Sequence, residues 1–276
     1  MRKAKDNALK VLMSLCAAAT CLLLIGLIGY LLYRGIPGIN AKFLTTQTSY
    51  ISDTIGILPN ILNTLYLIIL VMIIVVPLGV GAAVYLTEYA TNKRISNAVG
   101  FAVETLTGIP SIIFGLVGML FFTQILGLRQ GLLAGSLTLI IMVLPTVISN
   151  TKESLLAVPQ SYREGALALG SGKWHMVRTV VLPNAVDGIV TGCILAVGRV
   201  VGESAALLFT AGFGLKLLGF AKALQSSAAS LTVALYIYAS EEGKFDVAFA
   251  IAVILICITL IINLAASLVG RKVRKS

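Results

Sequence analysis

Six apolar runs, each long enough to cross a lipid bilayer, decide what this chain of 276 residues can fold into. An α-helix rises about 1.5 Å per residue, so about 20 apolar residues cross the roughly 30 Å of hydrocarbon. The runs are 11–33, 61–86, 105–128, 131–150, 186–209 and 247–270. No Pro-rich or Ser-rich linker separates them. We therefore predict an all-α polytopic membrane protein, with six transmembrane helices in a single domain over residues 1–276.

The charges of the chain follow these runs. Apolar residues make up 58% of the sequence and charged residues only 12%, with a net charge of +10. If the N-terminus is cytoplasmic, the four inner segments hold 14 Lys and Arg and the outer segments hold 6. Such a bias sets membrane orientation. We predict that both termini are cytoplasmic and that the charge does not reflect binding to nucleic acid.

One further segment, residues 225–240, has an apolar centre but is too short to cross a bilayer comfortably. A seventh span there would place the basic C-terminus outside. We predict an interfacial or re-entrant element on the outer side.

The loop over residues 151–185, between the fourth and fifth runs, has signals for two short helices. Ser161 and Glu164 form a capping-box pattern, and Gly170 provides a stop. A second helix is expected from near Lys173 to Leu182–Pro183, because proline interrupts the amide ladder. The two would form a projection; an amphipathic loop resting on lipid headgroups is the alternative.

Catalytic chemistry is not indicated anywhere in the chain. The stretch GSGKW at residues 170–174 resembles the end of a phosphate-binding loop, but Leu167 and Trp174 stand where that motif needs Gly and Ser or Thr. No cluster of His, Cys or carboxylates with catalytic or metal-ligand spacing is present. We predict that the chain is not an enzyme, has no catalytic residues, and binds no metal or cofactor itself.

Arg199 is the most unusual residue of the fifth run, because an arginine deep in a membrane span costs about 2.5–3.5 kcal/mol. Glu203 follows at i+4 and could pair with it on one helix face. The pair could simply fix the orientation of the helix. Alternatively, Arg199 and Glu203 line a polar pathway, in which the guanidinium attracts an anion.

Small and helix-breaking residues mark where spans pack closely or bend. Gly108, Pro110 and Ser111 interrupt the third run, and such breaks are tolerated where they border protein or a cavity. The fifth run carries two stripes of small residues, which predict close neighbours on two sides. The stripes are Gly188, Gly192 and Ala196, and Gly198, Gly202 and Ala206.

The loop resembles the cytoplasmic EAA loop of permease subunits of bacterial ABC importers. That loop reads Glu-Ala-Ala, then a glycine and, further on, a Leu-Pro pair; here the middle alanine is replaced by glycine, which lowers helix propensity by about 1 kcal/mol. The resemblance implies the ABC importer type I permease fold, with a coupling helix that engages the ATPases. The matching residues are Glu164, Gly165, Ala166, Gly170, Leu182 and Pro183.

A narrower resemblance covers the chain from about Leu78 onward. Residues 83–90, 106–116 and 182–208 are similar to the PstA-type permeases of bacterial phosphate importers. The family's Arg-x-x-Gly-Glu-Thr-Ala-Pro motif is matched from Arg199 to Glu203. Ser204 replaces the threonine and Ala206 the proline. The resemblance implies that Arg199, Glu203 and Ser204 belong to the translocation pathway.

This resemblance also implies partners and a location. The chain would be one permease of an ATP-driven phosphate importer in the bacterial inner membrane. It would work with a sister permease, two ATPase subunits that bind ATP and Mg²⁺, and an extracytoplasmic phosphate-binding protein. Another oxyanion, such as molybdate, sulfate or phosphonate, is an alternative cargo. An ion-coupled secondary transporter and a membrane-embedded enzyme are the alternatives in other classes.

Overall fold

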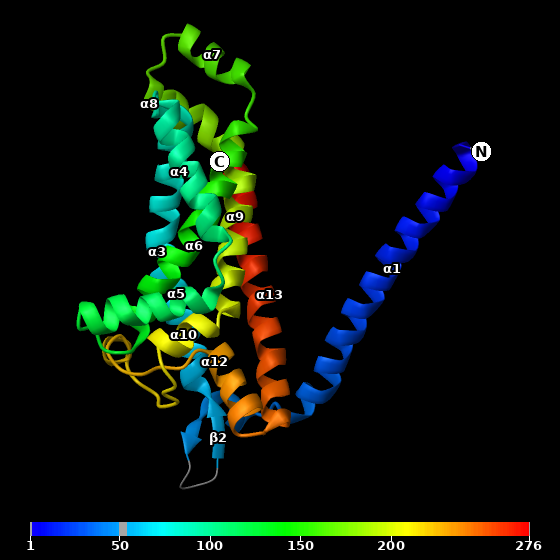
Figure 1. Ribbon diagram of the computed structural model, residues 1–276, viewed down its shortest axis with the longest axis vertical. Coiled ribbons are helices and arrows are strands. Elements are labelled where there is room, and N and C mark those ends of the chain that lie inside the picture. The colour runs from blue at the N-terminus through cyan, green and yellow to red at the C-terminus, as the bar shows by residue number, and fades with distance from the viewer. Residues whose placement is uncertain (1, 50–53, 276) are drawn as a thin grey trace.

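The computed structural model, which describes residues 2–49 and 54–275, is built mainly from helices (Figure 1). Within these residues five helices are long and apolar enough to cross a membrane, and a bent pair makes six if it counts as one span. The predicted all-α polytopic architecture is confirmed. The long helices are α1 (Arg2–Gly35), α3 (Leu58–Val84), α6 (Leu132–Leu156), α9 (Leu182–Gly202) and α13 (Phe245–Lys275).

The centre of the molecule is formed by α3, α6 and α9, with α13 packed along α9 (Figure 1). Their shared core is made of fully buried aliphatic side chains such as Val71, Leu139 and Met142. In contrast, α1 lies against α13 near Gly35 and then leans away from the bundle (Figure 1). None of the apolar span of α1 is buried against the rest of the chain. The described structure therefore has a packed bundle and one apolar helix without neighbours over most of its length.

The two ends of the bundle differ in structure. One end carries η1 (Ile36–Gly38), α2 (Ala41–Thr45) and an antiparallel hairpin of β1 (Gln47–Ser49) and β2 (Thr54–Ile57). The other end carries α7 (Gln160–Ala168) and α8 (Lys173–Met176), which project beyond the long helices (Figure 1). Both termini lie toward the α7 end (Figure 1). The projection predicted for residues 151–185 is thus present.

The third predicted span, residues 105–128, is not a single straight helix. It is replaced by α4 (Lys93–Thr107) and α5 (Ser111–Gly118), the latter extended by the π-helical turn η3 (Met119–Ile125). The two parts meet at 99°, and α5 runs across the bundle (Figure 1). Pro110 has extended backbone geometry and lacks an amide proton, so α4 cannot continue through it. The hydropathy of residues 105–128 gives no indication of this change of direction.

Residues 225–240 form a short buried element instead of a span. Helix α12 (Leu231–Tyr236) and the π turn η5 (Ile237–Glu241) pack between α3 and α13 at the hairpin end. Leu231, Val233 and Tyr238 are fully buried. The element is covered by protein, which agrees better with the re-entrant than with the interfacial form of the prediction. A second short helix, α11 (Phe220–Ala223), precedes it.

Candidate functional site

The projecting hairpin begins with α7, whose boundaries differ partly from those expected. The capping box was wrong: the helix starts at Gln160 after Pro159, and Ser161 lies inside its first turn without a side-chain cap. Pro159 fixes its own φ near the helical value and so sets the start. The stop at Gly170 is confirmed. Gly170 has a φ of +80°, and the amides of Gly170 and Ser171 bond to Leu167 O and Ala166 O in a Schellman motif.

The second helix of the hairpin does not end at Leu182–Pro183, so that prediction was wrong. Helix α8 continues through the π turn η4 (Val177–Val181) into α9, giving one helical segment of 30 residues from Lys173 to Gly202. The Leu182 amide bonds to Val177 O, five residues back, and this wider turn accommodates the ring of Pro183 in the first turn of α9. The hairpin and the fifth span are therefore continuous.

The residues of the EAA-like pattern divide between an outer and an inner face. Glu164, Gly165 and Gly170 are exposed, and a Cβ added at Gly165 would meet nothing within 4 Å. Ala166 and Leu182 are half-buried and pack against the cluster formed by Ala83, Val84, Leu155, Val158, Met176, Val177, Val181 and Ala185. Pro183 is exposed at the base of the hairpin. The outer face of α7 thus has no close contacts with the part of the chain that the structure describes.

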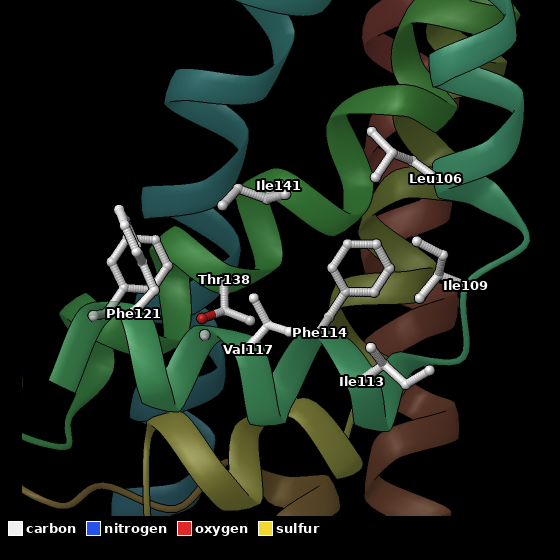
Figure 2. Close-up of a pocket in the computed structure, with 10 residues that line it drawn as sticks. Leu106, Ile109, Ile113, Phe114, Val117, Phe121, Thr138 and Ile141 are labelled. Atoms are coloured by element: carbon white, nitrogen blue, oxygen red, sulfur yellow. The ribbon is translucent and has the colours of Figure 1, made fainter. Parts of the chain in front are cut away.

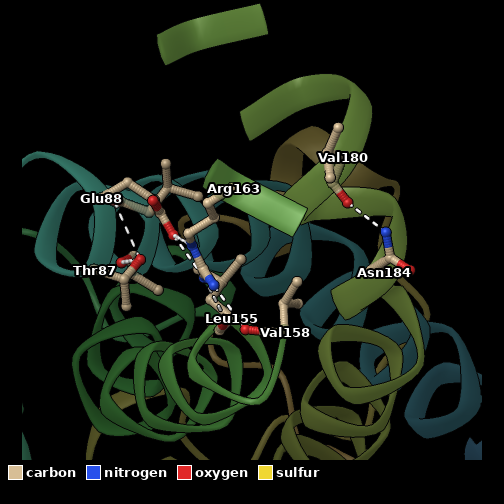
Figure 3. Close-up of polar contacts among 9 residues, drawn as sticks. Thr87, Glu88, Leu155, Val158, Arg163, Val180 and Asn184 are labelled. Carbon is tan, nitrogen blue, oxygen red and sulfur yellow. Dashed lines mark hydrogen bonds and ion pairs between the residues drawn. The ribbon is translucent and has the colours of Figure 1, made fainter. Parts of the chain in front are cut away.

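Arg163, on the inner face of α7, makes the strongest polar contact of the hairpin (Figure 3). Its Nε and Nη2 donate to Glu88 Oε1 at 3.0 and 2.9 Å, and Glu88 lies in the π turn η2 (Tyr85–Tyr89) at the end of α3. Its Nη1 and Nη2 also donate to Val158 O and Leu155 O, both at 2.7 Å. One guanidinium group therefore joins α7 to the ends of α3 and α6. Neither residue belongs to a sequence motif that marks this contact, because they are 75 residues apart.

At the far end of α9 the helix breaks at Glu203, which has extended backbone geometry, and restarts as α10 (Ala205–Thr210). Glu203 is buried; its Oε1 accepts a 2.9 Å bond from the Ala206 amide, and its carbonyl oxygen accepts one of 2.8 Å from Thr232 Oγ1. The break thus forms without the family's proline. Because the helix ends before Glu203, the predicted i,i+4 pair with Arg199 does not form. Ser204 lies half-buried in the break.

Arg199 is partly buried, and its Nη1 donates a long 3.5 Å bond to Thr146 Oγ1 on α6. Over residues 2–49 and 54–275, no carboxylate forms an ion pair with it. The guanidinium group has five N–H donors, so most remain available. An arginine in this state can bind an anion bidentately, and no counter-charge from the described chain competes for it.

The two small-residue stripes of α9 behave differently. Gly188 and Gly192 pack against Ser154 and Asn150 of α6, as expected. Gly198 and Gly202 have no atom within 4 Å of an added Cβ, so the described residues provide no close neighbour for them. Ala206 lies beyond the helix break and packs against Gly115 of α5. The face of α9 that carries Gly198 and Gly202, called the open face below, continues toward the hairpin with residues at helical spacing, several of them polar. Its exposed members are Asn184, Asp187, Thr191, Leu195 and Gly202.

The other helix break, at Gly108–Pro110, leads into an apolar cavity of about 340 Å³ between α5 and α6 (Figure 2). Phe114 and Val117 of α5 and Phe121 of η3 face Thr138 and Ile141 of α6 across it (Figure 2). The Thr138 hydroxyl already donates to Ala134 O. Such a lining cannot replace the hydration of an inorganic anion, so this cavity is not an anion site. Gly108, Pro110 and Ser111 therefore serve to turn the chain.

Comparison with known proteins identifies the class of molecule to which these features belong. Residues 75–275 match the family of binding-protein-dependent transport system inner membrane components. The chain belongs to this family. It is therefore a multi-pass inner membrane permease subunit of an ABC importer, and it is not itself catalytic. Permeases of this family work with ATPase and substrate-binding partners.

Individual relatives and solved structures agree with this assignment. A probable ABC transporter permease of Bacillus subtilis, YqgI, is 36% identical over 99% of this chain and 98% of its own length. The phosphate transport system permease protein PstA of Xylella fastidiosa is 35% identical over 66% of this chain and 63% of that protein. The PstA 1 protein of Mycobacterium tuberculosis H37Rv is 36% identical over 71% and 64%.

The fold itself is shared with crystallised importers. A bacterial alginate ABC transporter aligns with a TM-score of 0.67 at 17% identity, covering 96% of both chains. The MetNI methionine transporter aligns with a TM-score of 0.62 at 24% identity, covering 79% of this permease and 94% of that chain. The type I permease architecture is thus confirmed.

Proposed function

We propose that this permease, paired with a sister permease, forms the translocation pathway of an importer for inorganic phosphate. The observation that carries the proposal is Arg199, a partly buried cation on α9 with one long hydrogen bond and no ion-pair partner among the described residues. Phosphate carries the charge and the acceptor oxygens that a guanidinium group binds best. The phosphate transport permeases among its relatives support the same cargo.

The open face of α9 supports a pathway beside Arg199. Successive residues of an α-helix are turned by about 100°, so Arg199 lies at the edge of the open face that runs from Asn184 to Gly202. Gly198 and Gly202 on this face leave room for the close approach of a neighbouring helix, so we assign the face to the pathway and to the facing sister permease. Glu203 holds the break at the outer end of this face, with Ser204 beside it.

The exposed outer face of α7 is the proposed coupling surface for the ATPases, which bind ATP and Mg²⁺. Glu164, Gly165 and Gly170 lie there without contacts that would block a partner. If α7 is cytoplasmic, both termini are too, because they lie toward the same end (Figure 1). A reporter fused after Ser240 is expected outside the cytoplasm, and a cytoplasmic signal would overturn this orientation.

The cargo is tested with the complete importer in proteoliposomes. The complex is supplied with its phosphate-loaded binding protein, and ATP-dependent uptake of radiolabelled phosphate is measured with excess sulfate, molybdate or phosphonate as competitors. We expect uptake that only unlabelled phosphate suppresses. Suppression by one of the other oxyanions, with its own labelled form taken up, would replace phosphate by that anion.

A further inference from the structure

We propose that Arg163 is a positioning residue that transmits the movement of the coupling helix α7 to α3. This inference rests on the proposed function, because it concerns how force received by α7 reaches the membrane helices. It adds a specific residue pair, Arg163 and Glu88, to the coupling mechanism.

The covalent path of the chain connects α7 directly to α6 and α9 but not to α3. Helix α7 follows α6 after a short turn at 157–159, and it joins α9 through α8 and η4. Movement of α7 therefore reaches α6 and α9 along the backbone. Helix α3 has no such connection, because 75 residues separate Glu88 from Arg163 in the sequence.

The ion pair between Arg163 and Glu88 supplies a direct polar link between α7 and the end of α3. Only 11% of the Arg163 side chain and 6% of the Glu88 side chain are exposed, so the pair is shielded from water and salt. Glu88 belongs to a helical segment of 32 residues from Leu58 to Tyr89, which includes the whole of α3. A displacement of Glu88 therefore acts on one end of a helix that passes through the bundle.

The remaining bonds of Arg163 make the contact rigid. Four of its five N–H donors are used, two on Glu88 Oε1 and one each on Leu155 O and Val158 O. Because these acceptors come from η2 and from the end of α6, the planar guanidinium fixes three helix ends in one geometry (Figure 3). A lysine has the same charge but cannot reproduce this planar set of directions.

Other contacts between the hairpin and the end of α3 are less directional. Ala166 packs against the apolar cluster that includes Ala83 and Val84, which sets no fixed direction between the helices. Lys173 Nζ lies 5.1 Å from the centre of the Tyr89 ring, at an exposed position. Such an exposed cation–π contact does not hold two helices at a fixed angle as a set of four hydrogen bonds does. Glu164, the neighbour of Arg163, points outward. Adjacent residues of α7 thus have separate roles, one toward the ATPase and one toward α3.

The test compares Arg163→Lys with Arg94→Lys, an exposed arginine on α4, in the complete importer. We expect Arg163→Lys to retain its ATPase subunits and basal ATP hydrolysis, while phosphate transported per ATP falls about fivefold. Arg94→Lys should leave this ratio unchanged. Glu88→Gln keeps the side-chain volume and an acceptor oxygen, and it should reduce the phosphate transported per ATP about twofold. This variant tests the proposal if Arg163→Lys does not assemble. An unchanged ratio in both variants would overturn the proposal.

A second measurement separates this inference from the choice of cargo. Spin labels are placed on Ala168→Cys of α7 and Thr91→Cys beyond η2, both exposed, after the four native cysteines are replaced by serine. With and without ATP, we expect a narrow distance distribution in the parent importer and a broad one with Arg163→Lys. Equal distributions would overturn the proposal. If the parent importer takes up no phosphate but the distance distributions are as expected, the result would count against phosphate as the cargo and not against the role of Arg163.

Discussion

Two arginine side chains, Arg163 on α7 and Arg199 on α9, are both partly enclosed by the chain but are bonded in opposite ways. Arg163 uses four donors within the chain and faces a carboxylate. Arg199 makes one bond of 3.5 Å to a hydroxyl group and has no ion-pair partner among the described residues. The difference separates a charge that organises the protein from a charge that is available to a ligand.

Removing a paired charge and removing an unpaired charge have different effects on the stability of a fold. Removing one partner of a buried, hydrogen-bonded ion pair leaves the other charged and desolvated, which destabilises the fold strongly. Removing a charge that has no partner relieves a desolvation cost, so stability should not fall. Substitutions at the two arginines should therefore change different quantities.

The largest effect is expected for Arg163→Met, measured as stability. Glu88 and the carbonyl groups of Leu155 and Val158 would lose their donors while remaining enclosed. The free energy of unfolding should fall by about 3–5 kcal/mol. Thermal unfolding of the purified permease measures this, with Arg94→Met as the exposed control. A loss as small as that of the control would contradict the comparison.

The next effect is expected for Arg199→Gln, measured as transport. Loss of a charged donor to phosphate should reduce uptake at least about tenfold. The thermal midpoint should stay equal or rise, because the removed charge has no ion-pair partner in the described structure. Arg199→Lys, which keeps the charge, should retain part of the uptake. A midpoint as low as that of Arg163→Met would mean that Arg199 serves the fold.

A smaller effect is expected at Glu203, the residue that could have neutralised Arg199 but caps α10 instead. Glu203→Ala removes the acceptor for the Ala206 amide and should cost about 1 kcal/mol. Glu203→Gln keeps an oxygen in the same place and should cost less than half as much. Equal losses in the two variants would indicate that the negative charge itself matters, as it would in a pair with Arg199.

The smallest effect, and a stabilising one, is expected for Gly165→Ala, two residues after Arg163. The position is helical, and an added Cβ meets nothing within 4 Å. Alanine should therefore stabilise α7 by about 0.5–1 kcal/mol. Gly192→Ala is the matched control, because its Cβ would lie 2.7 Å from Asn150 Cβ and should destabilise the fold. A lower thermal midpoint for Gly165→Ala would show that the outer face of α7 is not free.

Features set by neighbouring residues were predictable from the sequence. The stop at Gly170 and the break before Ser111 follow from local glycine and proline chemistry, and they occur where the residues indicated. The long apolar helices follow from length and hydropathy. The start of α7 differs from the prediction because Pro159 sets it, and the Ser161 pattern does not.

Features that depend on distant contacts were not predictable in the same way. The ion pair of Arg163 with Glu88 joins residues 75 apart, and no spacing rule connects them. The break at Glu203 is supported by Thr232, which lies in the first turn of α12. An i,i+4 rule assumes a continuous helix, so it produced the wrong Arg199–Glu203 pair. The π turn at 177–181 likewise accommodates Pro183, which was expected to end a helix.

The continuity of α8, η4 and α9 has a consequence for how the chain can vary. The helical segment from Lys173 to Gly202 has 30 residues, or about 45 Å of uninterrupted helix. Each residue inserted or deleted between Pro183 and Arg199 would turn the arginine by about 100° and shift it by about 1.5 Å relative to the hairpin. The number of residues between Pro183 and Arg199 is therefore fixed by geometry, whichever side chains occupy the exposed positions between them.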